Sequence, residues 1–337
     1  MARYLVTGAT GFLGGHLVEA LCAHGHEVVA LARGLAPVDL GEGVTVRRGD
    51  ILEPQSIVDA AAGTDGIFHC AGVVSRKRED AELLRRVHVE GTRNVVAAAR
   101  TAGVRRVVHA STSGTVAIGE DRDHLHTEDD PTPYGLIARF PYYRAKLYAE
   151  EAAFEGNRDG LEVVSVNPSL LLGPGDARGS SSEDVRLFLE RRIPAVPPGG
   201  LSFVDARDAA EAMRLAMDAG EPGQRYLVGS CNATMRAFFD RLERVSGVRG
   251  PVIPMPRSTT LARLGGDLLE RAGARFGIDL GLDPVALEMS ALFWYVDSAR
   301  AERVLGWRPR DAGETLHDTV DDLRRRGVVW PREEHDP

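Results

Sequence analysis

The fold of this chain is decided by the stretch Thr7-Gly8-Ala9-Thr10-Gly11-Phe12-Leu13-Gly14. The apolar residues 3–6 in front of it predict a short buried strand, and the apolar positions after it have the spacing of an amphipathic helix up to Gly25. A strand, a glycine-rich turn and a helix form the context that a dinucleotide-binding fingerprint requires. Gly8 permits the tight turn, Gly11 lets the backbone approach a pyrophosphate, and Gly14 lets the helix pack close to the sheet.

The start of this helix is the predicted phosphate site. Its free N–H groups and its dipole would hold the phosphates of a dinucleotide. An ordinary strand–helix turn is the alternative, since the chain has 37 glycines, but the strand, the spacing and the position all agree with the fingerprint. The residues expected to contact the cofactor here are Gly8, Thr10, Gly11, Phe12, Leu13 and Gly14.

Apolar runs with the length of strands alternate with helical stretches through the first half of the chain. They lie at residues 3–6, 27–32, 44–47, 66–70, 105–110 and 161–166. This alternation predicts an α/β fold with a Rossmann-type, doubly wound parallel sheet. Beyond about residue 170 the pattern changes, with proline-rich turns and with helices expected near 205–219, 232–246, 258–276 and 311–326.

The same change of pattern divides the chain into domains. Residues 1–170 are predicted to form the nucleotide-binding domain, with 201–230 returning to it. The segments 171–200 and 231–327 would form a smaller, discontinuous C-terminal lobe that binds the substrate. Residues 328–337 are polar and are expected to be a flexible tail.

Composition argues against several classes of protein. A formal net charge of −8 disfavours nucleic acid as the main partner. No apolar run approaches the roughly 18 residues of a membrane span, and the N-terminus lacks a signal-like region, so a cytoplasmic protein is expected. Cys22, Cys70 and Cys231 are few, odd in number and widely spaced, which indicates neither disulfides nor a zinc site, and no metal is expected.

Only two of the 41 basic residues are lysines, and one of them is Lys146, four residues after Tyr142. Four residues apart on a helix, the two side chains share one face. A free tyrosine has a pKa of about 10, and a nearby ammonium lowers that pKa, so the phenol becomes a usable proton donor or acceptor. Such pairs also arise by chance, and this one gains weight from the glycine-rich turn at the N-terminus.

The glycine-rich turn and the Tyr142–Lys146 pair together resemble the extended short-chain dehydrogenases/reductases of the NAD-dependent epimerase/dehydratase family. Further motifs of that family follow in order: Arg48-Gly49-Asp50-Ile51, Phe68-His69-Cys70-Ala71-Gly72, Val89-Glu90-Gly91-Thr92-Arg93-Asn94, Val166-Asn167-Pro168-Ser169, Gly173-Pro174-Gly175, Phe203-Val204-Asp205-Ala206-Arg207-Asp208 and Leu305-Gly306-Trp307-Arg308-Pro309. The likeness covers about residues 3–326 and looks closest to the dihydroflavonol-reductase-like branch, including its bacterial hopanoid-associated members.

The resemblance implies three catalytic groups. Tyr142 and Lys146 are two of them, and the third is a hydroxyl at the end of the fifth strand that binds the substrate carbonyl. Matching the segment that follows to the reductase-like branch assigns this hydroxyl to Thr112, with Ser111 and Ser113 as close competitors. Further cofactor contacts are implied for Asp50, Ile51, Cys70, Ala71, Gly72, Tyr142, Lys146 and Pro168.

Two histidines and the oligomeric state are further points of comparison with the family. His88 stands where many relatives carry an asparagine that anchors a proton relay, so a histidine relay and no relay are both open. His69 is interpreted as a structural residue at a strand end. Dimerisation through the helices near 80–102 and 138–156 is common in the resembling family, so a homodimer is one alternative and the oligomeric state stays open.

The end of the second predicted strand bears on the choice of cofactor. There an Asp or Glu binds the ribose 2′-hydroxyl of NAD, whereas an Arg accommodates the 2′-phosphate of NADP. The chain has Arg33 at this point and no acid until Asp39. We therefore expect NADP, bound through a charge-assisted fork from Arg33, with NAD as the alternative.

The resemblance implies an NADP-dependent carbonyl reductase or alcohol dehydrogenase acting on a small or polycyclic metabolite, with Tyr142 as the proton donor. A nucleotide-sugar epimerase or dehydratase with tightly bound NAD is the alternative, and a non-catalytic cofactor-sensing protein is a third hypothesis. Substrate choice is assigned to residues 174–200 and 255–295. Within them, Phe293-Trp294-Tyr295 would line a pocket or pack in the core, and Gly179-Ser180-Ser181-Ser182 would be a mobile lid or the cap of a helix.

Overall fold

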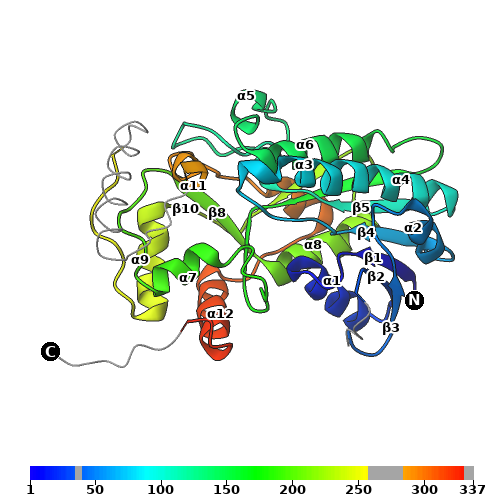
Figure 1. Ribbon diagram of the computed structural model, residues 1–337, viewed down its shortest axis with the longest axis horizontal. Helices are drawn as coiled ribbons and strands as arrows, with labels where there is room; N and C mark the ends of the chain where they lie inside the picture. The colour runs from blue at the N-terminus through cyan, green and yellow to red at the C-terminus, as the bar shows by residue number, and fades with distance from the viewer. Residues whose placement is uncertain (35–39, 257–283, 330–337) are drawn as a thin grey trace.

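A parallel sheet of seven strands forms the larger part of the molecule (Figure 1). The computed structural model describes residues 1–34, 40–256 and 284–329. The strands lie in the order β3 (Val44–Arg48), β2 (Glu27–Ala32), β1 (Arg3–Thr7), β4 (Gly66–His69), β5 (Arg106–Ala110), β6 (Glu162–Pro168) and β9 (Arg225–Val228). All neighbouring pairs are parallel, and the order changes direction between β1 and β4. The predicted doubly wound α/β fold is therefore confirmed.

Helices cover both faces of the large sheet. α1 (Phe12–Ala23) and α8 (Ala206–Ala219) pack on one face. α2 (Pro54–Ala61), α4 (Gly91–Thr101) and α6 (Pro141–Phe154) pack on the other. Successive residues of a strand point to opposite faces, so Leu5 belongs to the core under α2 and α4, whereas Val6 belongs to the core under α1 and α8. Burial on both faces explains why the central strands β1, β4 and β5 are mostly apolar, whereas the edge strand β3 is exposed and carries two arginines.

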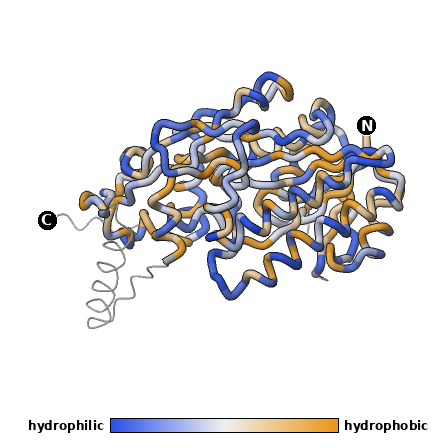
Figure 2. Tube along the Cα trace, turned by 90° about the horizontal axis from the view of Figure 1, so that it is seen from above, coloured by the Kyte–Doolittle hydropathy of each residue, from blue (hydrophilic) through white to orange (hydrophobic). Residues whose placement is uncertain are grey.

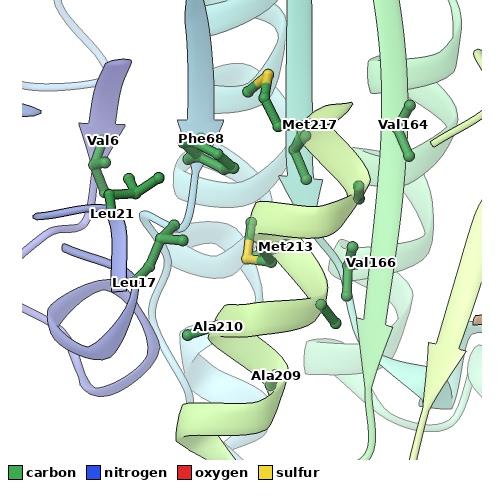
Figure 3. Close-up of a cluster of buried hydrophobic side chains, with 14 of the residues drawn as sticks. Val6, Leu17, Leu21, Phe68, Val164, Val166, Ala209, Ala210, Met213 and Met217 are labelled. Carbon is green, nitrogen blue, oxygen red and sulfur yellow. The ribbon is translucent and has the colours of Figure 1, made fainter. Parts of the chain in front are cut away.

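The core beneath α8 combines small and adaptable side chains (Figure 3). Ala209 and Ala210 let the helix approach the sheet, and the flexible thioethers of Met213 and Met217 fill the remaining space. Trp307 is fully buried in the same core. The C-terminal motif at 305–309 therefore completes the nucleotide-binding half of the molecule.

A second sheet of three strands, β10–β8–β7, supports the smaller lobe. Its strands are β7 (Leu170–Leu172), β8 (Gly200–Asp205) and β10 (Cys231–Thr234), and the helices around it are α7 (Glu183–Leu189), α9 (Met235–Ser246) and α12 (Ala312–Arg325). Their apolar side chains form a separate core. Seen from above, apolar residues follow the strands and the inner turns of the helices, while the outer loops are largely polar (Figure 2).

The helical region expected near 80–102 changes pitch along its length. It consists of α3 (Ala81–Leu84), a π-helical turn η2 (Arg85–Glu90) and α4. Such π turns are frequent at functional sites, and this one carries His88. The remaining helical turns are η1 (Arg78–Asp80), η3 (Ser113–Thr115), α5 (Tyr134–Ile137), α11 (Pro284–Met289) and η4 (Ala301–Leu305). Within the described ranges, no helix has the length and apolar character needed to cross a membrane.

The structure differs from the sequence-based boundaries in the second half of the chain. Residues 201–230 divide between the two sheets, because β8 joins the small sheet whereas α8 and β9 pack with the large one. The helix expected at 232–246 begins at Met235, because residues 231–234 pair with β8. The helix expected at 258–276 lies outside the described residues. So does the tail from 330 onward, but Val329 is buried in the core of the small lobe and is not part of a flexible tail.

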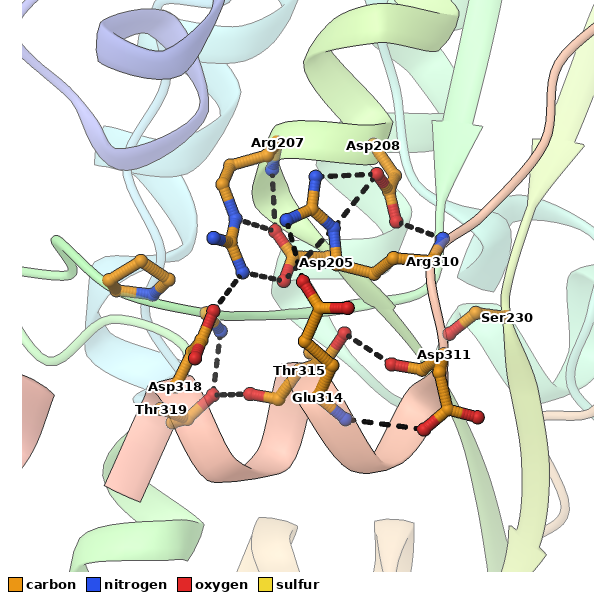
Figure 4. Close-up of polar contacts among 12 residues, drawn as sticks. Asp205, Arg207, Asp208, Ser230, Arg310, Asp311, Glu314, Thr315, Asp318 and Thr319 are labelled. Carbon is orange, nitrogen blue, oxygen red and sulfur yellow. Dashed lines mark hydrogen bonds and ion pairs between the residues drawn. The ribbon is translucent and has the colours of Figure 1, made fainter. Parts of the chain in front are cut away.

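A network of charges joins the end of β8 and the start of α8 to α12 and the segment before it (Figure 4). Asp205, at the end of β8, caps α8 by accepting from the Arg207 N–H at 2.9 Å and is fully buried. Arg207 also binds Asp318 of α12 at 2.6 Å, and Arg310 binds Asp208 at 2.9 Å. Burial alone would raise the pKa of Asp205, but the hydrogen bonds and charge of Arg207 and the charge of Arg310 outweigh it and lower that pKa.

Replacing Asp205 by Asn is expected to destabilise the protein by about 3–5 kcal/mol, because two arginines lose a buried counter-charge while the helix cap is retained. Because the pKa of Asp205 is lowered on folding, the loss should shrink as the pH falls through the range in which this carboxylate is protonated. Urea denaturation measures both effects. Glu302→Gln, which breaks the exposed pair with Arg308, is the control and should cost less than about 1 kcal/mol. A similar loss in the two variants would contradict this role for Asp205.

Candidate active site

The carboxyl ends of β1, β4, β5 and β6 meet at one edge of the large sheet, where the strand order changes direction. Open parallel sheets bind ligands at this place. The glycine-rich turn follows β1, and at Gly8 the backbone has φ +74°. A Cβ atom at Gly8 would lie 2.6 Å from the backbone nitrogen of Ala71. Only glycine therefore lets the turn pack against the segment that follows β4.

The approach of α1 to this turn depends on Gly14. A Cβ atom there would lie 2.1 Å from the carbonyl oxygen of Gly8. Gly11 is the N-cap residue of α1 and has no side-chain acceptor, so the N–H groups of the first helical turn, beginning at Phe12 and Leu13, stay available for an anion. Thr10 is exposed in the same turn. The geometry matches a pyrophosphate site.

The segment after β4 is held from three sides. The Ala71 N–H donates to the Thr7 hydroxyl at 3.3 Å, and the Cys70 thiol contacts the sulfur of Met213 at 3.7 Å. Gly72 faces the ring of His88, which a Cβ atom at Gly72 would approach to 2.7 Å. Cys70, Ala71 and Gly72 thus lie beside the glycine-rich turn.

The two histidines that the sequence singled out are both buried. His69 bonds to the hydroxyls of Thr7 at 2.7 Å and Thr92 at 3.0 Å, which agrees with a structural role. His88 bonds to the carbonyl of Val73 at 2.8 Å, and its ring packs edge-on against Tyr142 with 5.7 Å between centroids. Burial, followed by the charge of Lys146, lowers the pKa of both His69 and His88 to about 3. Both rings are neutral at physiological pH.

The ends of β2 and β3 form the other side of the candidate cofactor site. Arg33 is exposed directly after β2. Asp50 follows β3, and its carboxylate accepts from the Leu52 N–H at 2.9 Å, while Ile51 is buried. The sheet register places Arg48 opposite Ala32, so a second exposed arginine lies near Arg33. No role in cofactor binding was expected for Arg48 from the sequence.

Lys146 is buried beneath the active-site edge. Its ammonium donates to the carbonyl of Ala110, the last residue of β5, at 2.5 Å. Burial lowers the pKa of Lys146 to about 8, while Glu150 acts in the opposite direction. Burial and the neighbouring Tyr143 raise the pKa of Tyr142. The expected lowering of this pKa by Lys146 is therefore absent in the chain alone, because burial dominates and the ammonium is bound to Ala110.

The three candidate hydroxyls at the end of β5 differ in exposure. Thr112 is half-buried, whereas Ser111 and Ser113 are buried. The Thr112 hydroxyl accepts from the Gly114 N–H at 3.4 Å, and the Thr112 carbonyl accepts from Asn167 at 3.2 Å. Pro168, the last residue of β6, lies next to Asn167. Thr112 is thus more accessible to a substrate than either competitor.

A buried network behind Thr112 was missed by the sequence analysis. Glu150 lies one helical turn beyond Lys146 and is fully buried. Its carboxylate accepts from Asn167 at 2.5 Å and pairs with Arg225 of β9 at 3.1 Å. Through Asn167 it therefore fixes the backbone at Thr112. The four-residue spacing from Lys146 was a visible signal, but Arg225 is distant in sequence and nothing local identified it.

Aromatic side chains form one wall beside these groups. Tyr143 packs on Trp294 with 4.7 Å between ring centroids, and a Cβ atom at Gly114 would lie 2.3 Å from the Tyr143 ring. The Trp294 indole N–H donates to the carbonyl of Met289 at 3.1 Å. Phe293 and Tyr295 are buried and pack in the core, whereas Trp294, between them in the sequence, contributes to this wall.

The serine-rich segment 179–182 leads directly into α7, and Ser182 is the N-cap residue of this helix, as one of the two interpretations expected. Asp176, itself buried, accepts from the N–H groups of Ser180, Ser181 and Ser182 at 2.8–3.1 Å. The Ser182 hydroxyl donates to Asp176 and makes no capping hydrogen bond to α7, which begins at Glu183. These hydrogen bonds hold the segment in a defined conformation.

Replacing Gly14 by Ala tests the pyrophosphate site. The new methyl group would meet the Gly8 carbonyl, displace α1 and weaken binding of NADPH and NADH by at least on the order of a hundredfold. Gly15→Ala is the matched control, since its nearest neighbour would lie at 3.8 Å. It should bind like the parent protein and gain stability from the helix. Fluorescence titration measures binding, and circular dichroism verifies folding. Equal binding by the two variants would refute the site.

Replacing Glu150 by Gln tests its electrostatic effect on Lys146. Because the charge of Glu150 raises the pKa of Lys146 against the lowering by burial, that pKa should fall further below about 8. The chain has only two lysines, so an NMR titration of ¹³C-labelled lysine side chains resolves Lys146 from the exposed Lys77. Glu155→Gln removes the same charge from an exposed residue at the end of α6 and should leave the Lys146 signal in place. If the pKa of Lys146 is the same in Glu150→Gln as in the parent protein, the charge of Glu150 does not act on Lys146.

Known proteins share this sequence and arrangement. Sterol demethylase protein B of Methylococcus capsulatus is 35% identical over 331 residues, covering 96% of this chain and 99% of that protein. A Synechocystis protein whose name provisionally assigns it to dihydroflavonol 4-reductase is 30% identical over 335 residues, covering 97% and 96%. The solved structure of gox2253 matches with a TM-score of 0.83 at 28% identity, covering 98% of this chain and 100% of that one.

The family model matches as well. The model of the NAD dependent epimerase/dehydratase family matches residues 4–229, which include the glycine-rich turn, Thr112, Tyr142 and Lys146. The resemblance to the dihydroflavonol-reductase-like proteins of this family is likewise confirmed. The chain belongs to the NAD dependent epimerase/dehydratase family and is an oxidoreductase of that superfamily with the extended short-chain dehydrogenase/reductase fold.

Proposed function

We propose that this protein uses NADPH to reduce a ketone or aldehyde of an apolar metabolite, small or polycyclic, to the alcohol. The observation that carries the proposal is the contact between Lys146 and the carbonyl of Ala110 at 2.5 Å. It ties the helix of Tyr142 to the strand end that presents Thr112, so the three proposed catalytic residues share one edge of the sheet.

The protonation states of these groups suit reduction. Burial raises the pKa of Tyr142, so its phenol keeps its proton at neutral pH and can donate it. Lys146, with a pKa of about 8, stays mostly charged and can bind ribose hydroxyls while favouring the phenolate that forms. The Thr112 hydroxyl would donate to the carbonyl oxygen as negative charge develops there.

The bound nicotinamide would supply the hydride to the carbonyl carbon, which is chemistry that no side chain provides. The carbonyl oxygen then takes the Tyr142 proton, which completes the alcohol and leaves an oxidised dinucleotide. Gly8, Gly11 and Gly14 would place the pyrophosphate, and Pro168 would lie under the nicotinamide.

The preference for NADP rests on positive charge at the ends of β2 and β3. Arg33 and Arg48 are both exposed there, and the first acid after Arg33 is Asp39, which lies outside the described residues. Two guanidinium groups suit a 2′-phosphate, whereas NAD would be better served by a carboxylate.

The substrate class rests on the aromatic wall. Tyr143 and Trp294 offer a partly buried apolar surface beside Thr112 and Tyr142. Aromatic surfaces favour a ligand with rings or an extended apolar chain over a sugar. We therefore place the reactive carbonyl on such a molecule.

A nucleotide-sugar epimerase or dehydratase is the second candidate. It is favoured by the family model and needs the same tyrosine, lysine and hydroxyl. It would hold NAD tightly through the whole catalytic cycle, whereas a reductase releases its cofactor after each turnover. Cofactor retention therefore separates the two proposals.

Native mass spectrometry of freshly purified protein, followed by titration with NADPH and NADH, makes this test. Empty protein that binds NADPH more tightly than NADH is expected. NAD that remains bound after desalting would replace the reductase proposal with the epimerase proposal.

Tyr142→Phe tests the chemical step. It should bind NADPH like the parent protein and reduce a substrate identified from apolar ketones and aldehydes about 10²- to 10⁴-fold more slowly, because the proton donor is lost. Tyr148→Phe, at an exposed position of the same helix, should keep full activity. Undiminished turnover by Tyr142→Phe would exclude this tyrosine as the proton donor.

A further inference from the structure

A group of metal-binding side chains lies in the connection between η3 and α5, apart from the groups assigned to hydride transfer. His124 and His126 are two residues apart, and Asp130 follows four residues after His126. One ligand atom from each residue lies within 4.8 Å of the others. We infer that His124, His126 and Asp130 form a binding site for a divalent transition-metal ion of the zinc type.

The distances are those of a nearly formed site. One carboxylate oxygen of Asp130 lies 2.6 Å from Nε2 of His124 and 3.0 Å from Nδ1 of His126. Ligands of a tetrahedral zinc ion lie about 2.0–2.2 Å from the metal, and hence about 3.3 Å from one another. To reach that spacing, the carboxylate oxygen would have to move about 0.7 Å away from the His124 nitrogen and about 0.3 Å away from the His126 nitrogen. Both rings present a nitrogen to the same carboxylate oxygen, and they meet edge-on at 90° with centroids 4.4 Å apart.

Two of the three ligands are held in place by their surroundings. The His126 N–H donates to the Tyr295 carbonyl at 3.1 Å, and the His126 carbonyl accepts from the Asp297 N–H at 2.8 Å. The Thr127 hydroxyl donates at 3.1 Å to the other carboxylate oxygen of Asp130. This bond turns the free edge of the carboxylate toward the rings, as outer-shell partners of metal ligands do. His124 is about half exposed and provides the route of entry.

The electrostatic surroundings favour a cation. Six of the residues 120–130 are acidic and one is arginine. Nε2 of His126 is buried and has no hydrogen-bond partner among the described residues, so the protein uses only the other nitrogen of this ring.

The donor set selects the class of metal. Two imidazoles and one carboxylate suit Zn²⁺, Co²⁺ and Ni²⁺, whereas Mg²⁺ and Ca²⁺ take sites built of oxygen atoms. Three protein ligands leave a position for water. The site involves none of the three cysteines, whose number and spacing led to the expectation of no metal.

A bound ion would stiffen the wall of the active site. His126 pairs through its backbone with the segment around Val296, and Gly119 pairs with Phe293. Trp294 lies between these two attachments. Cross-linking His124 and His126 to Asp130 would therefore fix the loop on which the position of Trp294 depends. This inference concerns metal binding and stands independently of the proposed reaction.

Isothermal titration calorimetry of the full chain, treated with a chelator and then dialysed, tests the inference with Zn²⁺ and with Mg²⁺. One Zn²⁺ per chain should bind, and Mg²⁺ should not compete. Loss of an outer-shell partner of a metal ligand weakens metal binding by about 10- to 100-fold. Asp130→Asn and His126→Ala each change a ligand itself, so each should weaken Zn²⁺ binding by at least as much. His124→Ala removes an exposed ligand without disturbing the core and should weaken binding similarly.

His317→Ala is the matched control. His317 is exposed beside the carboxylate of Asp318 at 3.6 Å and has no third ligand within the described part of the chain, so its loss should leave the affinity unchanged. Co²⁺ spectra report the donor atoms, since a thiolate charge-transfer band would identify cysteine binding. The inference is overturned by such a band, by unchanged affinity in folded His124→Ala, or by the absence of Zn²⁺ binding. The last result would mean that the three side chains form only a closed set of hydrogen bonds.

Discussion

The distance between α1 and the turn that precedes it governs the geometry of the whole nucleotide-binding half. Gly14 lies against the carbonyl of Gly8, and Gly8 in turn lies against the backbone at Ala71, so two strand ends and one helix start are held within van der Waals contact. No side chain fits between them. The N–H groups at the start of α1 therefore face the sheet edge at which Thr112 and Lys146 also lie, and binding and chemistry share one place.

The second constraint is electrostatic. Lys146 is a buried charge, and the histidines around it are neutral because burial and this ammonium both lower their pKa values. His109 is an extreme case, since neither ring nitrogen has a hydrogen-bond partner among the described residues. Glu150 balances the ammonium from one helical turn away. Lys146 is thus a buried ammonium among neutral imidazole rings.

The sequence predicts the elements that neighbouring residues determine, but it does not predict the contacts between residues that are distant in the chain. Five of the first six strands (β1, β2, β4, β5 and β6) are largely buried and mostly apolar, and the glycine-rich turn has a fixed local geometry, so both could be found. β8 reads Gly200-Leu201-Ser202-Phe203-Val204-Asp205 behind a proline-rich turn, and its status as a strand depends on pairing with β7 and β10. The contacts of Glu150 with Asn167 and Arg225 could not be predicted for the same reason, because these residues are distant from it in the sequence. The raised pKa of Tyr142 depends on burial, which a four-residue spacing does not reveal.

The path of the chain through the two sheets has a consequence for synthesis on the ribosome. β9 completes the large sheet beside β6, but β7 and β8 of the other sheet are made between them. A nascent chain that ends after β6 already carries the glycine-rich turn, Tyr142 and Lys146, yet its last strand is an open edge and its face beside α1 lacks α8. Trp307 arrives later still. The nucleotide-binding half is therefore completed almost at the end of translation, and chaperones would encounter it as an exposed apolar surface until then.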